Sequence, residues 1–384
     1  MIIKNIKEVY EKHFGKDYLL VRSPGRINII GEHTDYNNGF VLPAAIDKAA
    51  YVAAGLRDDS EIHLVACDLN ETFSVNIQDL KPVGDVNWPN YILGAAAQFK
   101  KIDGSLKGFN AVFSGDVPIG AGLSSSAAVE CATVFVLNEL LKTDLSRIEM
   151  IRMAQKAEHE FAGVMCGIMD QFASIMGRKD HLIKLDCRSL QFEYIPFNLK
   201  GYKILLFNTN VKHSLASSEY NTRRRECGQA VDWIKPHEPH VHSLRDVTEA
   251  MLDKYVKPED ELIDKRSRFA VQEINRLQTA CDDLMKADII SLGKKMFETH
   301  YGLSTMYEVS CRELDFLVNT VHNDPAVIGA RMMGGGFGGC TINIIREDKA
   351  DEVGQHVKNI YEKTMQLPLT VYTAKIENGT SLIP

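Results

Sequence analysis

The chain has 384 residues, more than a single hydrophobic core usually holds, so we expect two domains, residues 1–198 and 199–384. Apolar residues make up 45% and charged residues 25%, which is the composition of an ordinary globular protein. The formal net charge of −7 argues against a general binder of nucleic acid or of anionic membranes, although a local basic pocket could still hold a small anion.

The N-terminus and the cysteines indicate a cytoplasmic protein. The first ten residues carry charges where a signal peptide has an unbroken apolar region. Ile6, Val9, Tyr10 and His13 have helical spacing and predict an amphipathic helix instead. None of the eight cysteines forms a Cys-x-x-Cys pair, so we expect reduced thiols in a reducing compartment. The most apolar long stretch, 127–141, is too short and too polar to span a bilayer.

The predicted elements mix strands and helices without strict alternation. In the first half, short segments rich in branched and aromatic residues predict strands at 18–22, 50–56, 62–66, 72–77 and 109–114. Helices are predicted there at 89–101, 124–141, 146–161 and 169–176. A run of strands is predicted next, and it ends with the strand at 203–208. The second half is predicted to contain further strands at 340–345 and 369–373, and helices at 217–233, 259–284, 287–300 and from about 349. This mixture predicts an α+β fold and not a doubly wound sheet.

A loop rich in glycine and serine runs from Pro118 to Ala128 and leads into the long apolar helix. Its glycines let the backbone approach a ligand, and the helix start presents unpaired N–H groups and the positive end of its dipole. A phosphate fits there, and the serine hydroxyls could bond its oxygens or coordinate Mg²⁺. A flexible loop with an ordinary serine cap is the alternative. No Gly-x-x-x-x-Gly-Lys-Ser/Thr motif occurs, which disfavours a P-loop fold.

A polar cluster in the first forty residues contains Arg26, Glu32, His33, Asp35 and Tyr36, and it lies between apolar segments. Charges in such a place need partners. The cluster could be an internal salt-bridge network, or a polar turn, because Asp-Tyr-Asn-Asn-Gly is strong turn chemistry. As a third interpretation, several fixed carboxylates could bind the hydroxyl groups of a sugar.

Two further segments carry candidate chemistry. Asp170 lies among apolar residues near Cys166, and a carboxylate in such surroundings is neutralised or paired with a cation. It could be a helix N-terminal carboxylate, or a base or electrostatic anchor beside a reacting hydroxyl. Gly334, Gly336 and Gly339 match a dinucleotide fingerprint, but they lead into a predicted strand and not into a helix. They form a plain tight turn or a close approach to the first glycine loop.

Together these segments resemble the galactokinases of the GHMP kinase family, over about residues 10 to 375 and in the family's order. The segments that carry the resemblance are GRINIIGEHTDYN at 25–37, GLSSSA at 122–127, GIMDQ at 167–171 and GGGFGG at 334–339. The resemblance implies a two-domain fold, with an N-terminal domain like domain 2 of ribosomal protein S5 and a ferredoxin-like C-terminal domain. It also implies transfer of the γ-phosphoryl group of ATP to the anomeric hydroxyl of galactose.

The resemblance implies a role for individual residues. Asp170 would be the base or electrostatic anchor at the anomeric hydroxyl, and Arg26 would stabilise charge beside it. The residues that would hold the sugar are Glu32, His33, Thr34, Asp35, Gly167 and Tyr220. Those that would bind ATP are Gly120, Ala121, Gly122, Leu123, Ser124, Ser125 and Ser126, with Trp88 and Tyr91 near the adenine. Ser126 and Glu158 would hold Mg²⁺.

Two alternatives share this resemblance, namely an N-acetylgalactosamine kinase and a non-catalytic sensor of galactose and ATP. Such sensors lack the Ser-Ala step that is present here at 126–127. The compact turn at 35–38 does not by itself exclude a larger sugar. Val164-Met165 departs from the Met-Pro of many relatives, and we expect it to alter loop packing and not chemistry. A monomer is expected, and Arg223-Arg224-Arg225 is interpreted as a solvated helix face.

Overall fold

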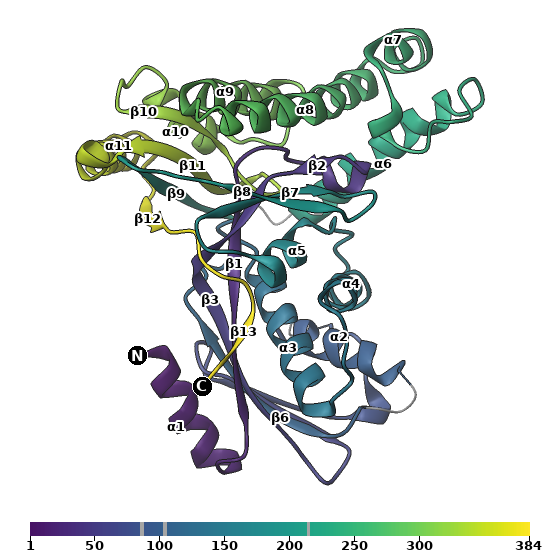
Figure 1. Ribbon diagram of the computed structural model, residues 1–384, viewed down its shortest axis with the longest axis vertical. Coiled ribbons are helices and arrows are strands. Elements are labelled where there is room, and N and C mark those ends of the chain that lie inside the picture. Colours follow the sequence, from purple (N-terminus) through teal and green to yellow (C-terminus); the bar gives the residue numbers. More distant parts are fainter. Residues whose placement is uncertain (85–87, 103–105, 213–215) are drawn as a thin grey trace.

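The computed structural model describes the chain except for residues 85–87, 103–105 and 213–215 (Figure 1). Within the described residues, the strands form one large sheet in the first part of the chain, another in the second part, and a small sheet between them. Helices pack against both large sheets. This mixture confirms the α+β class that the sequence predicts.

The first sheet has the strand order β13-β1-β3-β6-β4-β5. Its strands are β1 (Leu19–Asn28), β3 (Pro43–Leu56), β4 (Glu61–Ala66), β5 (Glu71–Asn76), β6 (Phe109–Gly115) and β13 (Ser381–Ile383). One face carries α1 (Ile2–Phe14), and the other carries α2 (Trp88–Lys100), α3 (Ser125–Leu141), α4 (Arg147–Ala157) and α5 (Met169–Met176). Because successive side chains of a strand point to opposite faces, Ala53 packs with α1 whereas Val52 and Ala54 pack on the α3 side.

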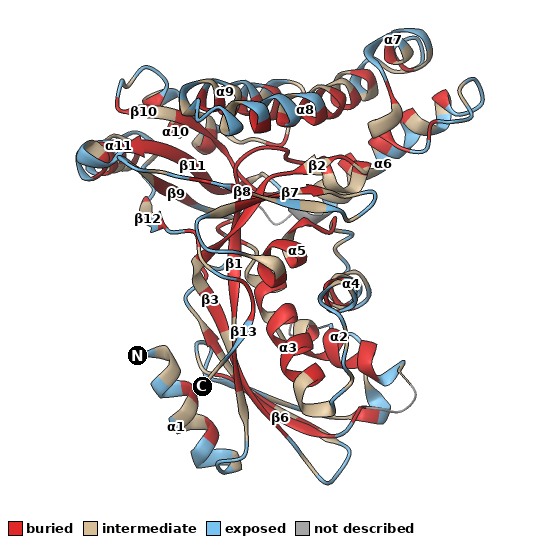
Figure 2. Cartoon of the chain, in the orientation of Figure 1, coloured by how far each residue is buried: buried red, intermediate tan, exposed pale blue. Residues whose placement is uncertain are grey.

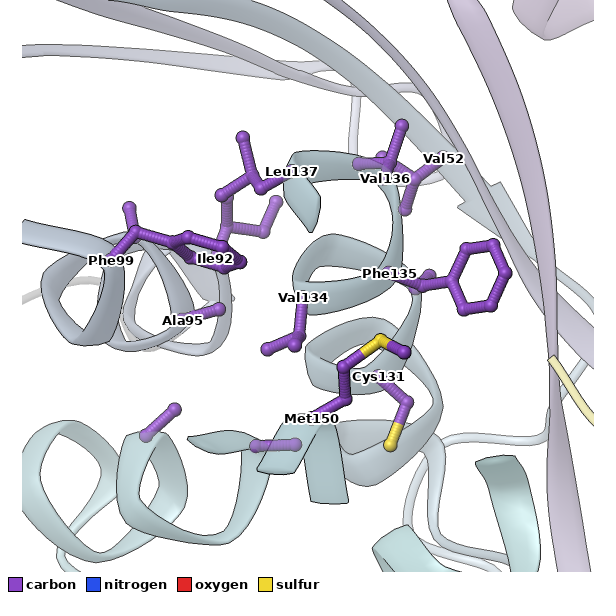
Figure 3. Close-up of a cluster of buried hydrophobic side chains, with 14 of the residues drawn as sticks. Val52, Ile92, Ala95, Phe99, Cys131, Val134, Phe135, Val136, Leu137 and Met150 are labelled. Carbon is purple, nitrogen blue, oxygen red and sulfur yellow. The ribbon is translucent and has the colours of Figure 1, made fainter. Parts of the chain in front are cut away.

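The helix α3 is apolar on nearly all sides, and such a helix is buried. Figure 3 shows its side chains surrounded by those of neighbouring elements, including Ile92 from α2, Met150 from α4 and Val52 from β3. Buried residues accordingly run along α3 and the strands behind it (Figure 2). The glycine- and serine-rich loop therefore leads into a helix that is fixed by its packing.

The second large sheet has the order β10-β11-β9-β12. Its strands are β9 (Tyr202–Lys212), β10 (Val327–Met332), β11 (Gly338–Arg346) and β12 (Thr370–Ala374). The helices of this part are α6 (Ala216–Ile234), α7 (Glu249–Met251), α8 (Glu261–Met285), α9 (Ile289–Thr305), α10 (Arg312–Val321) and α11 (Ala350–Met365). Ile204 and Leu206 pack in the same cluster as side chains of α8 and α9, whereas Leu205 and Phe207 pack with α10 and α11. Both faces of this sheet are therefore buried.

The small sheet consists of β2 (Phe40–Val41), β7 (His181–Asp186) and β8 (Phe192–Pro196), and it lies between the two large sheets (Figure 1). The last strand, β13, returns to the first sheet and pairs Ile383 with Leu20 of β1. The C-terminal strand thus belongs to the sheet of the N-terminal part. The domain boundary between residues 198 and 199 stays a prediction.

Most predicted elements are confirmed, and the differences are local. β2, α7, β10, α10 and β13 were not predicted from the sequence. The helix expected at 146–161 begins with a capping box between Ser146 and Glu149, but α4 ends at Ala157 and continues as the π-helical turn η3 (Glu158–Ala162). Such turns often occur at functional sites.

No helix among the described residues is both long and apolar enough to cross a membrane. All eight cysteines are free thiols, and four of them are buried: Cys131, Cys227, Cys281 and Cys340. This agrees with the expectation of reduced cysteines.

Candidate active site

A cleft of about 420 Å³ lies where the two parts of the chain meet. The predicted site residues that line it are Arg26, Glu32, His33, Asp35, Gly120, Gly122, Glu158, Gly167, Asp170 and Tyr220. The second glycine run, 334–339, lines it as well. The chain thus brings into one cavity segments that are up to about three hundred residues apart in sequence.

The carboxylate of Asp170 is held by two partners at the centre of this cleft. Arg26 Nε donates to Asp170 Oδ1 at 2.8 Å, and Arg26 Nη2 donates to Oδ2 at 3.0 Å. Ser124 Oγ donates to Asp170 Oδ2 at 2.5 Å. The guanidinium is buried while the Asp170 side chain keeps 24% of its exposure, so the carboxylate faces the cavity. A bidentate pair of this kind fixes both orientation and charge.

The phosphate-loop candidate has the backbone shape that its glycines predict. Gly120 and Gly122 have φ values of 75° and 74°, a region that favours glycine, and Ser124 is left-handed at φ 60°. The Ser124 side chain makes no helix-cap hydrogen bond, since its hydroxyl bonds Asp170 instead. The loop therefore connects the start of α3 directly to the carboxylate in the cleft.

The two glycine loops touch each other. A Cβ atom added at Gly122 would lie 3.0 Å from Met333 O, and one added at Gly334 would lie 3.2 Å from Gly122 O. A Cβ atom at Gly339 would lie 3.1 Å from Ala121 C. This confirms the close-approach interpretation of the second glycine cluster, because side chains on either run would separate the loops.

Glu32 is oriented by a residue that sequence reasoning missed. Arg331 Nη1 donates to Glu32 Oε2 at 2.6 Å, and both side chains are buried. The same guanidinium donates to the backbone oxygens of Asn28, Ile29 and Met332. One feature of the sequence could have identified Arg331. It is a charged residue in an apolar segment just before the second glycine run, and a buried charge needs a partner.

His33 is neutral and has an open hydrogen-bonding position. Burial, and next the positive charge of Arg223, lower the pKa of His33 to about 3. Its Nδ1 atom lies 2.8 Å from Tyr36 Oη, which in turn lies 2.6 Å from Tyr307 Oη. Its Nε2 atom is buried without a hydrogen-bond partner among the described residues, and the residue lines the cleft. A buried polar atom of this kind suits a ligand hydroxyl. The ring of Tyr220 lies 5.5 Å from that of His33.

Asp35 and Gly167 form one wall of the cleft. Burial, and next the charge of Asp170, raise the pKa of Asp35 to about 7. A Cβ atom at Gly167 would lie 1.7 Å from Asp35 Oδ2, so only glycine fits against this carboxylate. The backbone at Gly167 and the Asp35 side chain therefore occupy fixed positions relative to each other.

A second group of acidic residues lies beside the start of α3. Ser126 Oγ donates to Glu158 Oε1 at 3.0 Å, and Gln171 Nε2 donates to Glu158 Oε2 at 2.7 Å. Burial, and next the charge of Asp170, raise the pKa of Glu158, and burial raises that of Glu130 well above its ordinary value. Among the described residues, no three His, Cys, Asp or Glu side chains form a metal-binding group.

Several predicted ligand contacts lie outside the cavity lining. Thr34 donates its hydroxyl to the backbone oxygens of Gly31 and Phe40. Trp88 donates to Glu71 Oε2 at 2.6 Å and packs beside Phe113. The others are Tyr91, Ser124, Ser125 and Ser126, which are partly buried, and Ala121 and Leu123, which are buried. Their roles toward a ligand stay predictions.

The arginine run on α6 is only in part a solvated face, so that expectation is wrong for Arg223. Arg223 is 4% exposed and donates to the backbone oxygens of Tyr307 and Glu308 at 2.8 and 2.9 Å. A buried guanidinium requires such acceptors. Arg224 is partly buried and Arg225 is exposed.

Comparisons with known proteins agree on one family. Residues 8–56 match the galactokinase galactose-binding signature, residues 90–178 match the N-terminal domain of GHMP kinases, and residues 281–363 match the GHMP kinase C-terminal domain. The chain is 38% identical to the galactokinase of Clostridium acetobutylicum, over all of this chain and 98% of that one. It is 39% identical to the galactokinase of Fusobacterium nucleatum, over all of this chain and 99% of that one.

The chain is also similar to solved structures of this family. The galactokinase of Lactococcus lactis in complex with galactose superposes with a TM-score of 0.94 at 34% identity, and 99% of each chain is covered. The mevalonate kinase of Methanococcus jannaschii shares the fold, with a TM-score of 0.65 at 19% identity over 94% of this chain and 99% of that one.

Proposed function

The chain belongs to the galactokinases of the GHMP kinase family, and from this premise we propose that it transfers the γ-phosphoryl group of ATP to the anomeric hydroxyl of α-D-galactose, giving α-D-galactose 1-phosphate and ADP. The observation that carries this assignment is the 2.5 Å hydrogen bond between Ser124 Oγ and Asp170 Oδ2. It joins the loop suited to a triphosphate to the carboxylate suited to a sugar hydroxyl. Donor and acceptor would therefore meet within one cleft.

Galactose would lie among Glu32, His33, Asp35 and Tyr220, with the backbone at Gly167 closing one side. The two carboxylates accept hydrogen bonds from sugar hydroxyls, and neutral His33 offers its free Nε2 atom. Several fixed partners at defined positions select one arrangement of hydroxyls. The anomeric hydroxyl would face Asp170.

Phosphoryl transfer depends mainly on positioning and on neutralising charge. Asp170 would orient the anomeric hydroxyl and accept its proton late in the step, because a loose transition state leaves the hydroxyl protonated until then. Arg26 and the N–H groups at the start of α3 would stabilise the negative charge on the transferring group. Residues 120–126 would wrap the ATP phosphates, and Trp88 and Tyr91 would lie near the adenine.

Ser126 and Glu158 are suited to hold Mg²⁺ together with phosphate oxygens of ATP. Mg²⁺ takes oxygen ligands and is commonly bound by one or two carboxylates plus substrate phosphates. The raised pKa of Glu158 reports a buried carboxylate near other acids, where a cation would favour ionisation. When bound, Mg²⁺ would neutralise negative charge on the β- and γ-phosphates.

The experiment that tests this function measures ADP formation from ATP with galactose, with N-acetylgalactosamine and with no sugar. We expect ADP to form with galactose and to stop when the metal is chelated. Faster turnover with N-acetylgalactosamine would favour the alternative sugar. Binding of galactose and ATP without any turnover would identify a sensor and contradict the proposed reaction.

The affinity for galactose should depend on pH through Asp35. Its pKa in the folded protein, about 7, lies above the ordinary 3.8, so Asp35 becomes protonated as the pH falls through 7. A carboxylate accepts stronger hydrogen bonds from sugar hydroxyls than a neutral carboxyl does. We therefore expect the KM for galactose to rise as the pH falls from 8 to 6.

An Asp35→Asn variant provides the control for this pH dependence. It should have a high KM that is insensitive to pH over the same range. His33 stays neutral throughout, because its pKa is lowered to about 3. A wild-type KM that is flat between pH 6 and pH 8 would contradict the role of Asp35.

Replacing Gly167 with alanine should weaken galactose binding strongly. The new Cβ atom would lie 1.7 Å from Asp35 Oδ2, so the carboxylate or the backbone must move. We expect the KM for galactose to rise at least about tenfold, the effect of losing one hydrogen bond to a charged group. Gly228→Ala on α6 is a matched control, because a Cβ atom there meets no neighbour within 4 Å. Equal galactose KM values for the two variants would refute the contact.

A monomeric cytoplasmic enzyme fits these features. We propose that the enzyme acts as a monomer. The free thiols suit a reducing compartment. Light scattering on the purified protein measures its mass directly, and a dimer would contradict the first of these inferences.

A further inference from the structure

The segment between η3 and α5, residues 163–168, has no regular secondary structure, yet it supplies Gly167 to the wall of the cleft. The position of this loop decides where Gly167 meets Asp35. Its Met165 side chain is 41% exposed, so apolar packing of that side chain does not hold the loop. Ile168 packs in the core and fixes the end of the loop, so the backbone around Met165 must be held in another way.

Side chains from three elements bond this backbone. Gln155 of α4 and His159 of η3 reach Cys166 O at 3.2 and 2.8 Å. The helix α6 provides the other two contacts. Arg224 Nη1 donates to Met165 O at 2.5 Å, and Asn221 Oδ1 accepts from Met165 N at 3.4 Å. Both bonds run from the second half of the chain to a loop of the first half.

A second pocket lies beside the loop 163–168, so the loop depends on these hydrogen bonds for its position. This mostly polar pocket of about 290 Å³ is lined by Gln155, Cys166, Gly167 and Arg224, and by Asp35 from the wall of the cleft. Water can fill such a pocket, so no close-packed core supports the loop from this side. Without its hydrogen bonds, the loop could relax into the pocket and carry Gly167 away from Asp35.

We propose that Arg224 and Asn221 are positioning residues that clamp the loop 163–168 and thereby set the affinity for galactose without touching the sugar. This inference rests on the proposed placement of galactose beside Asp35 and Gly167. Tyr220, the neighbour of Asn221 on α6, lines the sugar cleft itself. The two bonds therefore fix the position of Gly167, in the first part of the chain, relative to Tyr220, in the second part.

The test compares Arg224→Met with Arg225→Met. Arg225 is the matched control, because it is exposed on the same helix and, within the described part of the chain, its guanidinium bonds Thr222 of that helix at 3.0 Å. For Arg224→Met we expect the KM for galactose to rise about tenfold, the usual effect of losing a charged hydrogen-bond donor, with kcat and the KM for ATP close to the wild-type values. Arg224→Lys keeps one donor and should recover part of the affinity.

Calorimetry of galactose binding without ATP makes the outcome independent of turnover. Weaker binding by Arg224→Met than by Arg225→Met supports the clamp, and equal binding overturns it. Equal losses in kcat and in both KM values would also overturn it, because they indicate general structural damage. Should Arg224→Met fail to fold, Asn221→Leu against Asn221→Asp makes the same comparison, since aspartate keeps the acceptor for Met165 N. A wild-type protein that binds galactose but does not phosphorylate it would refute the proposed function and leave the clamp to be judged by binding alone.

Discussion

Replacing Asp170 with alanine should lower kcat at least about a thousandfold, within the range measured for loss of a positioned acid or base. The substitution removes the group that would orient the anomeric hydroxyl and accept its proton. It also leaves the guanidinium of Arg26 without its bidentate partner and frees the Ser124 hydroxyl. Steady-state kinetics with galactose and ATP measure the change.

Two further measurements separate a chemical role from a structural one. ATP binding by Asp170→Ala, followed by calorimetry, should stay close to wild type, because the phosphate loop keeps its glycine conformation. Ser124→Ala removes only one hydrogen bond to the same carboxylate and should cost far less turnover. Turnover by Asp170→Ala within a few-fold of wild type would refute the assignment of this residue.

Replacing Arg331 with methionine should lower the free energy of unfolding by about 3–5 kcal/mol, the cost of breaking a buried ion pair by removing one partner. Glu32 would be left as an unpaired buried charge, and three backbone oxygens at the ends of β1 and β10 would lose their donor. Urea denaturation at constant pH measures the change.

Arg346→Met is the control for Arg331→Met. Arg346 pairs with Asp348 at 2.6 Å, but their side chains are 50% and 60% exposed. An exposed pair contributes at most about 1 kcal/mol. If both variants lose the same small amount, Arg331 does not hold Glu32 in the way described.

Much of the fold could be predicted from the sequence, because the patterns that determine a helix or a strand lie within short segments of the chain. The alternation in β4 places Ile62, Leu64 and Ala66 in the interior, and the apolar sequence of α3 requires burial. The glycines at 120 and 122 and the serine run identified a loop that approaches a ligand. The polar cluster around Glu32 and Asp35 identified one wall of the cleft.

Long-range contacts were not readable in this way. Neither β1 nor β13 signals that Leu20 pairs with Ile383, because a strand pattern specifies a face and not a partner. Arg223 was mistaken for a surface residue because its acceptors, the backbone oxygens of Tyr307 and Glu308, are eighty-odd positions away. The bond from Arg224 to Met165 O was missed for the same reason.

The measurement that tests the catalytic arrangement most directly is a crystal structure of the protein with galactose and a non-hydrolysable ATP analogue. The sugar should lie against Glu32, His33 and Asp35 with its anomeric oxygen within hydrogen-bonding distance of Asp170, and the γ-phosphate should lie at the start of α3. A sugar bound with a different hydroxyl facing Asp170, or a triphosphate bound away from residues 120–126, would contradict it.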